Sequence, residues 1–298
     1  MEGGWKMVYY GQMMIFAIVL AAAMPAYQFV SDSVDGLIAG TNPTNALTRF
    51  LDYPSRSPFF GLHPTFTPNP RFWAKDIDFS CASPWNSAGG ALRAGTLVSK
   101  RHVIFAQHFP LWKGVRIAFV DGEGQTCVCS IEKTKAIPQS DITVGLLDYE
   151  VTPNIHPAKI LPLDFRKHIG DGAGLPVVTF DQTECVTVAD MDAIPTNLTW
   201  RIGRASKPQD ARRLAFSKTV RNGDSGNPAF LLVGKEPLLL YTQHGGRYGS
   251  GSSMHSFRRE IQAAMDELCP GYKLEEFDFS RLRRGTRKPI DLPSRLRD

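Results

Sequence analysis

Residues 95–108 read GTLVSKRHVIFAQH, and they contain two short apolar runs separated by a Ser-Lys-Arg turn. Short apolar and β-branched runs on either side of a tight turn are typical of consecutive antiparallel strands. The second run ends at His108, so the pattern predicts a histidine at the end of a buried strand. Catalytic side chains often lie where a rigid strand passes into a loop. His108 is therefore the first candidate functional residue.

Similar apolar runs recur as far as residue 242. They lie at residues 115–120, 126–131, 142–147, 176–180, 228–233 and 237–242. The turn Asp121-Gly-Glu-Gly joins the first two of these runs as a hairpin. No amphipathic helix intervenes, so we expect an all-β sandwich or barrel. One helix is expected after the strands, at about residues 256–269, because Phe257, Ile261 and Met265 share an apolar stripe with Ala264 and Leu268.

Residues 222–228 read NGDSGNP, which places Ser225 between glycines in a tight turn. Such a turn presents the hydroxyl and leaves nearby backbone N–H groups to face a developing oxyanion. A serine is a weak nucleophile and needs a positioned histidine as general base, oriented by a carboxylate. The segment SDITVGLL supplies one, because Asp141 abuts a buried run and has to be paired there.

These three segments, in this order, resemble those of the chymotrypsin/trypsin-like serine peptidases. GTLVSKRHVIFAQH resembles the family's strand-turn-strand ending in Ala-Ala-His, SDITVGLL its Asp-Ile-Ala-Leu-Leu, and NGDSGNP its Gly-Asp-Ser-Gly-Gly-Pro. The resemblance covers about residues 71–270. It implies a peptidase domain at 71–272 made of two six-stranded antiparallel β-barrels and a C-terminal helix. Barrel one would span about 71–160, barrel two about 161–255, and the helix about 256–269.

The resemblance also implies a secreted, bacterial-type serine endopeptidase that hydrolyses peptide bonds through an acyl-enzyme. His108 would be the general base, Asp141 its orienting partner and Ser225 the nucleophile. The backbone N–H groups of Gly223 and Ser225 would form the oxyanion hole. Neither a metal nor an organic cofactor is expected, and the partner would be a protein or peptide substrate.

The resemblance places the substrate pocket around Thr219, six residues before Ser225, with Thr242, His244 and Gly245 in its wall. Thr219 is not a carboxylate, so a preference for Lys or Arg is not expected. His244 could favour an acidic substrate side chain; the alternative is an exposed loop histidine. Phe109 stands where the animal enzymes have a cysteine, and Asn227 replaces their second glycine. With no Ile-Val-Gly-Gly N-terminus, we expect Asp224 to be satisfied internally.

The N-terminal region carries the apolar run MMIFAIVLAAA at residues 13–23. A run of this length that ends in small residues, here Ala21, Ala22 and Ala23, is typical of a signal peptide, which is predicted at 1–26. The alternatives are an uncleaved anchor from Met7 to Phe29 and a buried core helix. The signal peptide predicts a secreted or periplasmic protein, and the anchor predicts a membrane-anchored one. Residues 27–70 are rich in Pro, Ser, Thr and Asn and are expected to form a linker or an N-terminal arm.

A basic C-terminal tail is predicted at 273–298. From Arg281 onward it holds seven Lys or Arg and two Asp, a sum of +5 that equals the net charge of the whole chain. A solvated tail is expected and no nucleic-acid partner is. The five cysteines leave at least one unpaired, and Cys127 and Cys129 would share one face of a strand. Two rival interpretations remain: a catalytically inactive exported binding module, and a membrane-tethered peptidase, which requires retention of the N-terminal segment.

Overall fold

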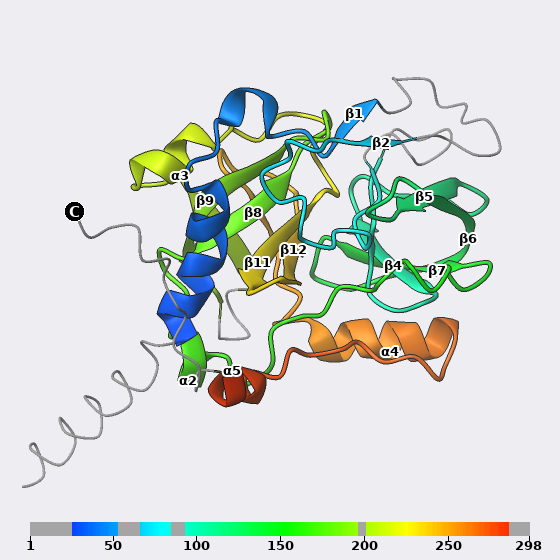
Figure 1. Cartoon of the computed structure of the whole chain (residues 1–298). Coiled ribbons are helices and arrows are strands. Elements are labelled where there is room, and N and C mark those ends of the chain that lie inside the picture. Colours follow the sequence, from blue (N-terminus) through cyan, green and yellow to red (C-terminus); the bar gives the residue numbers. More distant parts are fainter. Residues whose placement is uncertain (1–25, 53–65, 85–92, 196–200, 286–298) are drawn as a thin grey trace, which may run out of the picture.

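The protein contains two curled antiparallel sheets that lie side by side, with few helices (Figure 1). The structure is a computed structural model that describes residues 26–52, 66–84, 93–195 and 201–285. The sheets have the form of half-barrels and are compatible with a two-barrel arrangement. The all-β class predicted from the sequence is confirmed.

The first sheet carries the segment with which the sequence analysis began. Its strands are β3 (Thr96–Leu97), β4 (His102–Ala106), β5 (Arg116–Val120), β6 (Thr126–Ala136) and β7 (Ile142–Leu147). Their spatial order is β3-β4-β7-β6-β5. Every residue of β4 and β7 is buried, as their continuous apolar runs require. The expectation of six strands was wrong for the described residues, since the chain before β3 adds only the bridge of Ala82 to Thr96. Pro84 follows, and a proline cannot donate to a ladder.

The second sheet has the six strands expected. They are β8 (Pro176–Phe180), β9 (Val186–Ala193), β10 (Ile202–Ser206), β11 (Pro228–Val233), β12 (Glu236–Thr242) and β13 (Ser250–Ser252). Their spatial order is β12-β11-β8-β9-β10-β13. The curl of the sheet brings its two edge strands together. They meet where the His244 N–H, just after β12, donates to the Ser250 carbonyl of β13 at 2.8 Å. This contact brings β13 beside the end of β12.

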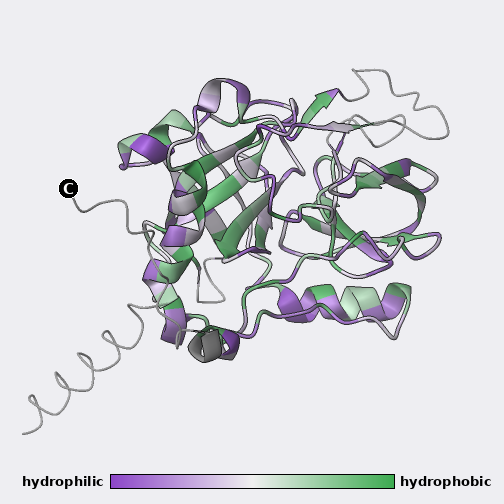
Figure 2. Cartoon of the chain, viewed as in Figure 1, coloured by the Kyte–Doolittle hydropathy of each residue, from purple (hydrophilic) through white to green (hydrophobic). Residues whose placement is uncertain are grey.

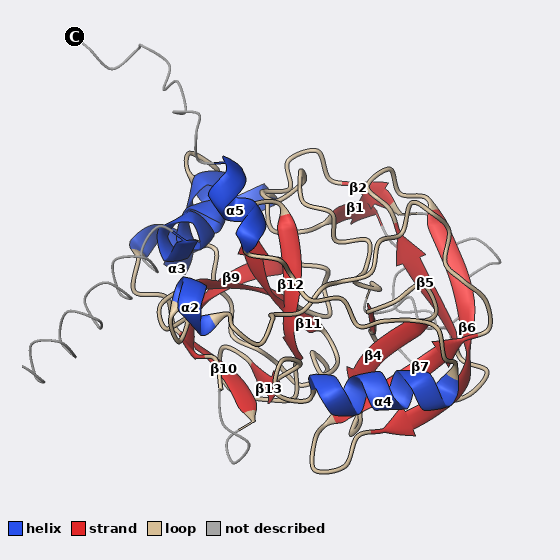
Figure 3. Cartoon of the chain, turned by 90° about the horizontal axis from the view of Figure 1, so that it is seen from below, coloured by secondary structure: helices blue, strands red, loops and turns tan. Residues whose placement is uncertain are grey.

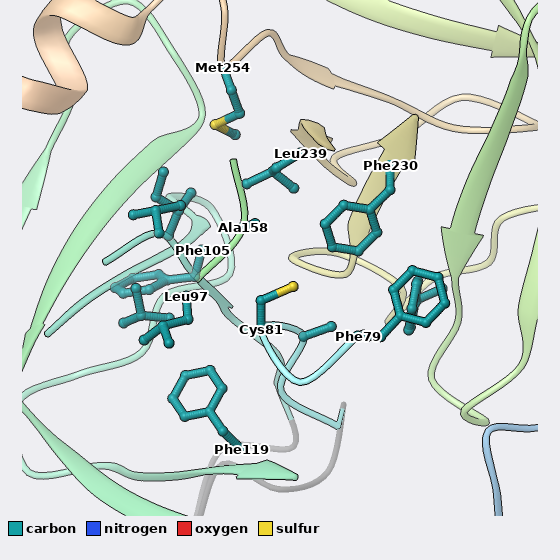
Figure 4. Close-up of a cluster of buried hydrophobic side chains, with 14 of the residues drawn as sticks. Phe79, Cys81, Leu97, Phe105, Phe119, Ala158, Phe230, Leu239 and Met254 are labelled. Atoms are coloured by element: carbon teal, nitrogen blue, oxygen red, sulfur yellow. The ribbon is translucent and has the colours of Figure 1, made fainter. Parts of the chain in front are cut away.

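One apolar core joins the two sheets (Figure 4). Phe105 and Phe119 enter it from the first sheet, and Phe230 and Leu239 from the second. Phe79, from the segment before β3, packs against the second sheet, with its ring centroid 5.7 Å from that of Phe230. The sheets are therefore docked through buried side chains rather than through loops alone.

The arm at residues 27–70 contains a helix that the sequence analysis missed. Residues 26–38 are helical and lie along the second sheet (Figure 1). Val30, Val34 and Ile38, four residues apart, are at most 2% exposed. The chain continues through η1 (Pro43–Asn45) to the paired strands β1 (Phe50–Asp52) and β2 (Thr67–Pro68). The described part is thus a packed arm and not a linker. The predicted signal peptide falls on residues 1–25, outside the described residues apart from its last position.

Buried ion pairs fix this helix to the second sheet. Arg213, in α3 (Ala211–Ala215), is 7% exposed. Its guanidinium donates to both carboxylate oxygens of Asp35 at 2.7 Å and to Asp190 of β9 at 3.0 Å. It also donates to the Ser31 hydroxyl at 2.6 Å. One cation therefore links two helices and a strand that are far apart in the sequence.

The expected C-terminal helix is α4 (Arg258–Leu268). It buries Ile261, Ala264 and Met265 and lies along the first sheet beside β6 and β7 (Figure 3). Hydrophobic and hydrophilic bands alternate along its ribbon, because an amphipathic helix keeps its apolar residues on one face and its polar residues on the other (Figure 2). The chain thus returns from the second sheet to brace the first.

Beyond residue 272, the predicted end of the peptidase domain, the chain still packs against the core. Phe277 and Phe279 are buried, and the Phe277 N–H donates to the Ile160 carbonyl at 2.9 Å. The His168 ring stacks on Phe279 with centroids 4.8 Å apart. The short helices α2 (Arg166–Ile169) and α5 (Ser280–Gly285) lie near each other here (Figure 1). Within the described ranges, no helix is long and apolar enough to span a bilayer.

All five cysteines are free thiols. Cys127 and Cys129 share the buried face of β6, as predicted, with their Sγ atoms 3.9 Å apart. The fold is therefore held by apolar packing and buried ion pairs rather than by disulfide bonds.

His102, at the start of β4, is fully buried, and burial together with Arg101 lowers the pKa of its imidazole from 6.5 to about 4. A depressed folded-state pKa stabilises the fold fully above pH 6.5, and this contribution is lost as the pH falls towards 4. We expect the free energy of unfolding to fall by about 3 kcal/mol across this window through His102 alone. Urea denaturation at a series of pH values measures it. His102→Gln should flatten the slope.

Candidate active site

Asp141 stands immediately before β7, at the junction of the two sheets. Its carboxylate accepts the His108 backbone N–H at 2.8 Å through Oδ1 and contacts His108 Nδ1 at 2.7 Å through Oδ2. Its own N–H donates to the Ser252 hydroxyl of β13 at 2.9 Å. The Asp141 carboxylate thus contacts both the backbone and the ring of His108, and the Asp141 backbone is hydrogen-bonded to the second sheet.

The tautomer of His108 follows from these contacts. An ionised carboxylate only accepts hydrogen bonds, so Nδ1 carries the ring proton. Nε2 then accepts from the Ser225 hydroxyl, whose Oγ lies 2.8 Å away. The structure therefore brings the three candidates Asp141, His108 and Ser225 into one continuous chain of hydrogen bonds. Such an arrangement can transfer a proton from the hydroxyl to the imidazole as the oxygen attacks.

Backbone geometry that suits glycine shapes the turn around Ser225. Gly223 and Gly226 have φ of +100° and +87°. A Cβ at Gly226 would lie 3.2 Å from the Ala94 carbonyl, so the turn fits closely against the first sheet. The predicted oxyanion donors, Gly223 and Ser225, flank Asp224 within this turn.

Asp224 is buried and internally satisfied, as expected. Its carboxylate accepts the Arg221 N–H at 2.7 Å and the Gln182 N–H at 3.0 Å. Burial raises the pKa of this carboxyl despite those bonds. The carboxylate holds the loop before Ser225 against the turn after β8 (residues 176–180).

The four predicted pocket residues lie in different environments. Thr219 is exposed, and its neighbour Val220 donates its N–H to the Arg247 carbonyl at 2.9 Å. Thr242 is buried at the end of β12, and Gly245 bridges to Ser250. His244 is an exposed loop histidine, and its ring stands edge-on to His108 with centroids 6.3 Å apart. His244 is therefore beside the general-base candidate.

Two residues at the site were missed from the sequence as site residues. Ser252 lies in a Gly/Ser stretch that gives no signal of a role. Gln243 was noted only as part of the segment from Thr242 to Gly246, yet it is completely buried and neither of its amide atoms has a hydrogen-bond partner. Burial depends on contacts distant in sequence, so the linear pattern could not single it out. Across the described residues, no three His, Cys, Asp or Glu side chains gather as metal ligands do.

Comparison of the chain with protein-family models and with curated proteins finds no match in either case.

Proposed function

We propose that this protein is a serine endopeptidase with a chymotrypsin-like arrangement of two β-barrels. The observation that carries the proposal is the hydrogen-bonded chain from Asp141 through His108 to Ser225, with contacts of 2.7 and 2.8 Å. Both barrels contribute, since His108 and Asp141 adjoin the first sheet and Ser225 precedes β11 of the second. The docked core between the sheets supports this alignment.

In the proposed reaction, Ser225 Oγ attacks the carbonyl carbon of a peptide bond while His108 Nε2 takes its proton. Asp141 holds the ring in the correct tautomer and stabilises the imidazolium that forms. The backbone N–H groups of Gly223 and Ser225 stabilise the oxyanion. His108 then gives the proton to the departing amine. In the second half of the reaction, His108 takes a proton from the water that attacks the acyl-enzyme and returns it to Ser225 Oγ.

Export from the cytoplasm is part of the proposal. It is supported by the apolar run at residues 13–23, which ends in the small residues Ala21, Ala22 and Ala23. The substrate would then be an extracytoplasmic protein or peptide.

A fluorophosphonate probe tests the proposal, because it reacts with serines activated by a neighbouring base. We expect the parent protein to be labelled at Ser225 and Ser225→Ala to remain unlabelled. Ser130→Ala, at a half-buried serine of β6, is the matched control and should be labelled like the parent. A folded parent that stays unlabelled would rule out the peptidase and leave the inactive binding module.

A further inference from the structure

Gln243 is a buried polar side chain without a partner. It follows β12, is 0% exposed, and both its Oε1 and Nε2 atoms lack a hydrogen bond. A buried amide left unpaired is unfavourable, and native structures contain few such groups. Its presence therefore points to a partner that binds there in the working protein.

The backbone of Gln243 is bonded directly to the turn of the candidate nucleophile. Its carbonyl accepts the Gly226 N–H at 2.9 Å, and its N–H donates to the Asn227 carbonyl at 2.8 Å. Gly226 and Asn227 are the two residues that follow Ser225. The next residue, His244, stands against the His108 ring. The unpaired amide thus belongs to the residue that supports one side of the active site.

A glycine backbone covers this amide. A Cβ built on Gly249 would lie 2.8 Å from Gln243 Oε1, 2.9 Å from Nε2 and 3.2 Å from the Tyr241 hydroxyl. The Tyr241 hydroxyl is also buried and without a hydrogen bond. Gly249 has φ of +114°, a conformation that other residues rarely adopt. Residue 249 therefore has to be a glycine. Because it has no side chain, only its backbone has to move for a ligand to reach the Gln243 amide.

We propose that Gln243 determines substrate specificity, and that its amide pairs with the primary amide of a glutamine side chain on the N-terminal side of the cleaved bond. The inference rests on the proposed peptidase function and extends it to a substrate class. Gly249 moves aside as the side chain enters.

Primary amides satisfy both halves of Gln243, because each offers one donor group and one acceptor. The Tyr241 hydroxyl provides a third partner that can donate or accept. A leucine would leave all three unpaired, and sites built for hydrogen bonds discriminate strongly against such analogues. A buried carboxylate would need a paired cation and would face Oε1. His244 is exposed beside His108, so the acidic preference considered for it is the competing result.

The test profiles cleavage sites in a proteome-derived peptide library, identified by mass spectrometry, with the full chain. We expect glutamine before the cleaved bond to be enriched over leucine and glutamate. Gln243→Met keeps the side-chain shape and removes both hydrogen-bonding atoms. It should lower kcat/KM for a glutamine peptide by about 100-fold relative to that for the matched leucine peptide, which no longer leaves an amide unpaired. Gln125→Met, at an exposed glutamine in the turn between β5 and β6, is the control and should behave as the parent does.

Two further readouts separate the possible failures. Fluorophosphonate labelling of Ser225 should be equal in the parent and Gln243→Met, and the melting temperature of the variant should be equal or higher, since it loses an unpaired amide. If the parent is labelled but selects an acidic residue, or if Gln243→Met keeps the parent's profile, the inference is overturned while the peptidase stands. A destabilised variant would also overturn it by showing that the amide has a structural partner. An unlabelled, inactive parent would instead refute the proposed function itself.

Discussion

If the proposed function holds, replacing Ser225 with alanine is expected to lower the rate constant for peptide hydrolysis by about 10⁶-fold, the scale observed in a known serine peptidase triad. His108→Ala should cost about as much, and the double variant no more than either single one, because the two residues act as a unit. Asp141→Asn should cost about 10⁴-fold, since an amide at this position favours the wrong tautomer of the histidine.

Single-turnover and steady-state assays on one peptide substrate would measure these losses. Circular dichroism and the melting temperature would establish that each variant is folded. The Ser130→Ala protein, which is expected to behave as the parent does, serves as the control. If the losses from Ser225 and His108 multiplied in the double variant, the two residues would be acting independently, and the proposed proton transfer between them would be excluded.

Replacing Arg213 with methionine is expected to lower the free energy of unfolding by about 3–5 kcal/mol. The methionine occupies similar space but leaves Asp35 and Asp190 without their shared cation. Removing one member of a buried ion-pair network is costly because the opposite charges stay behind in a medium that solvates them poorly. Denaturation by urea, followed by tryptophan fluorescence, measures the change.

Arg212 provides a matched control one residue away. It pairs with Asp210, but its side chain is 60% exposed, so Arg212→Met should change stability far less than Arg213→Met does. Equal losses in the two variants would show that the contacts of Arg213 with Asp35 and Asp190 do not anchor the N-terminal helix.

Elements with a strong local pattern could be predicted from the sequence. The runs at β4, β7, β8 and β11 are buried along their whole length and read as continuous apolar segments. The helix α4 has a clear stripe and a Pro-Gly stop. β13, with the sequence Ser-Gly-Ser, has no apolar residue, and its pairing depends on β10 and on the loop after β12.

The N-terminal helix shows a different limit. Only three of its buried positions are apolar, and its polar side chain Asp35 finds a partner 178 residues away. The candidate triad could be named because each member stands next to a distinctive run of residues. The burial of Gln243 and the contact of Ser252 with Asp141 could not be predicted, because they arise from the curl of the second sheet.

The link from the Asp141 backbone to Ser252 has a consequence for heat inactivation. The candidate triad is divided between the two sheets, and its hydrogen bonds of 2.7 and 2.8 Å tolerate little sliding of one sheet against the other. Proteins open in parts at lower free energy than they unfold as a whole. Warming should therefore loosen the junction between the sheets and stop turnover while each sheet is still folded, so that activity is lost below the melting temperature.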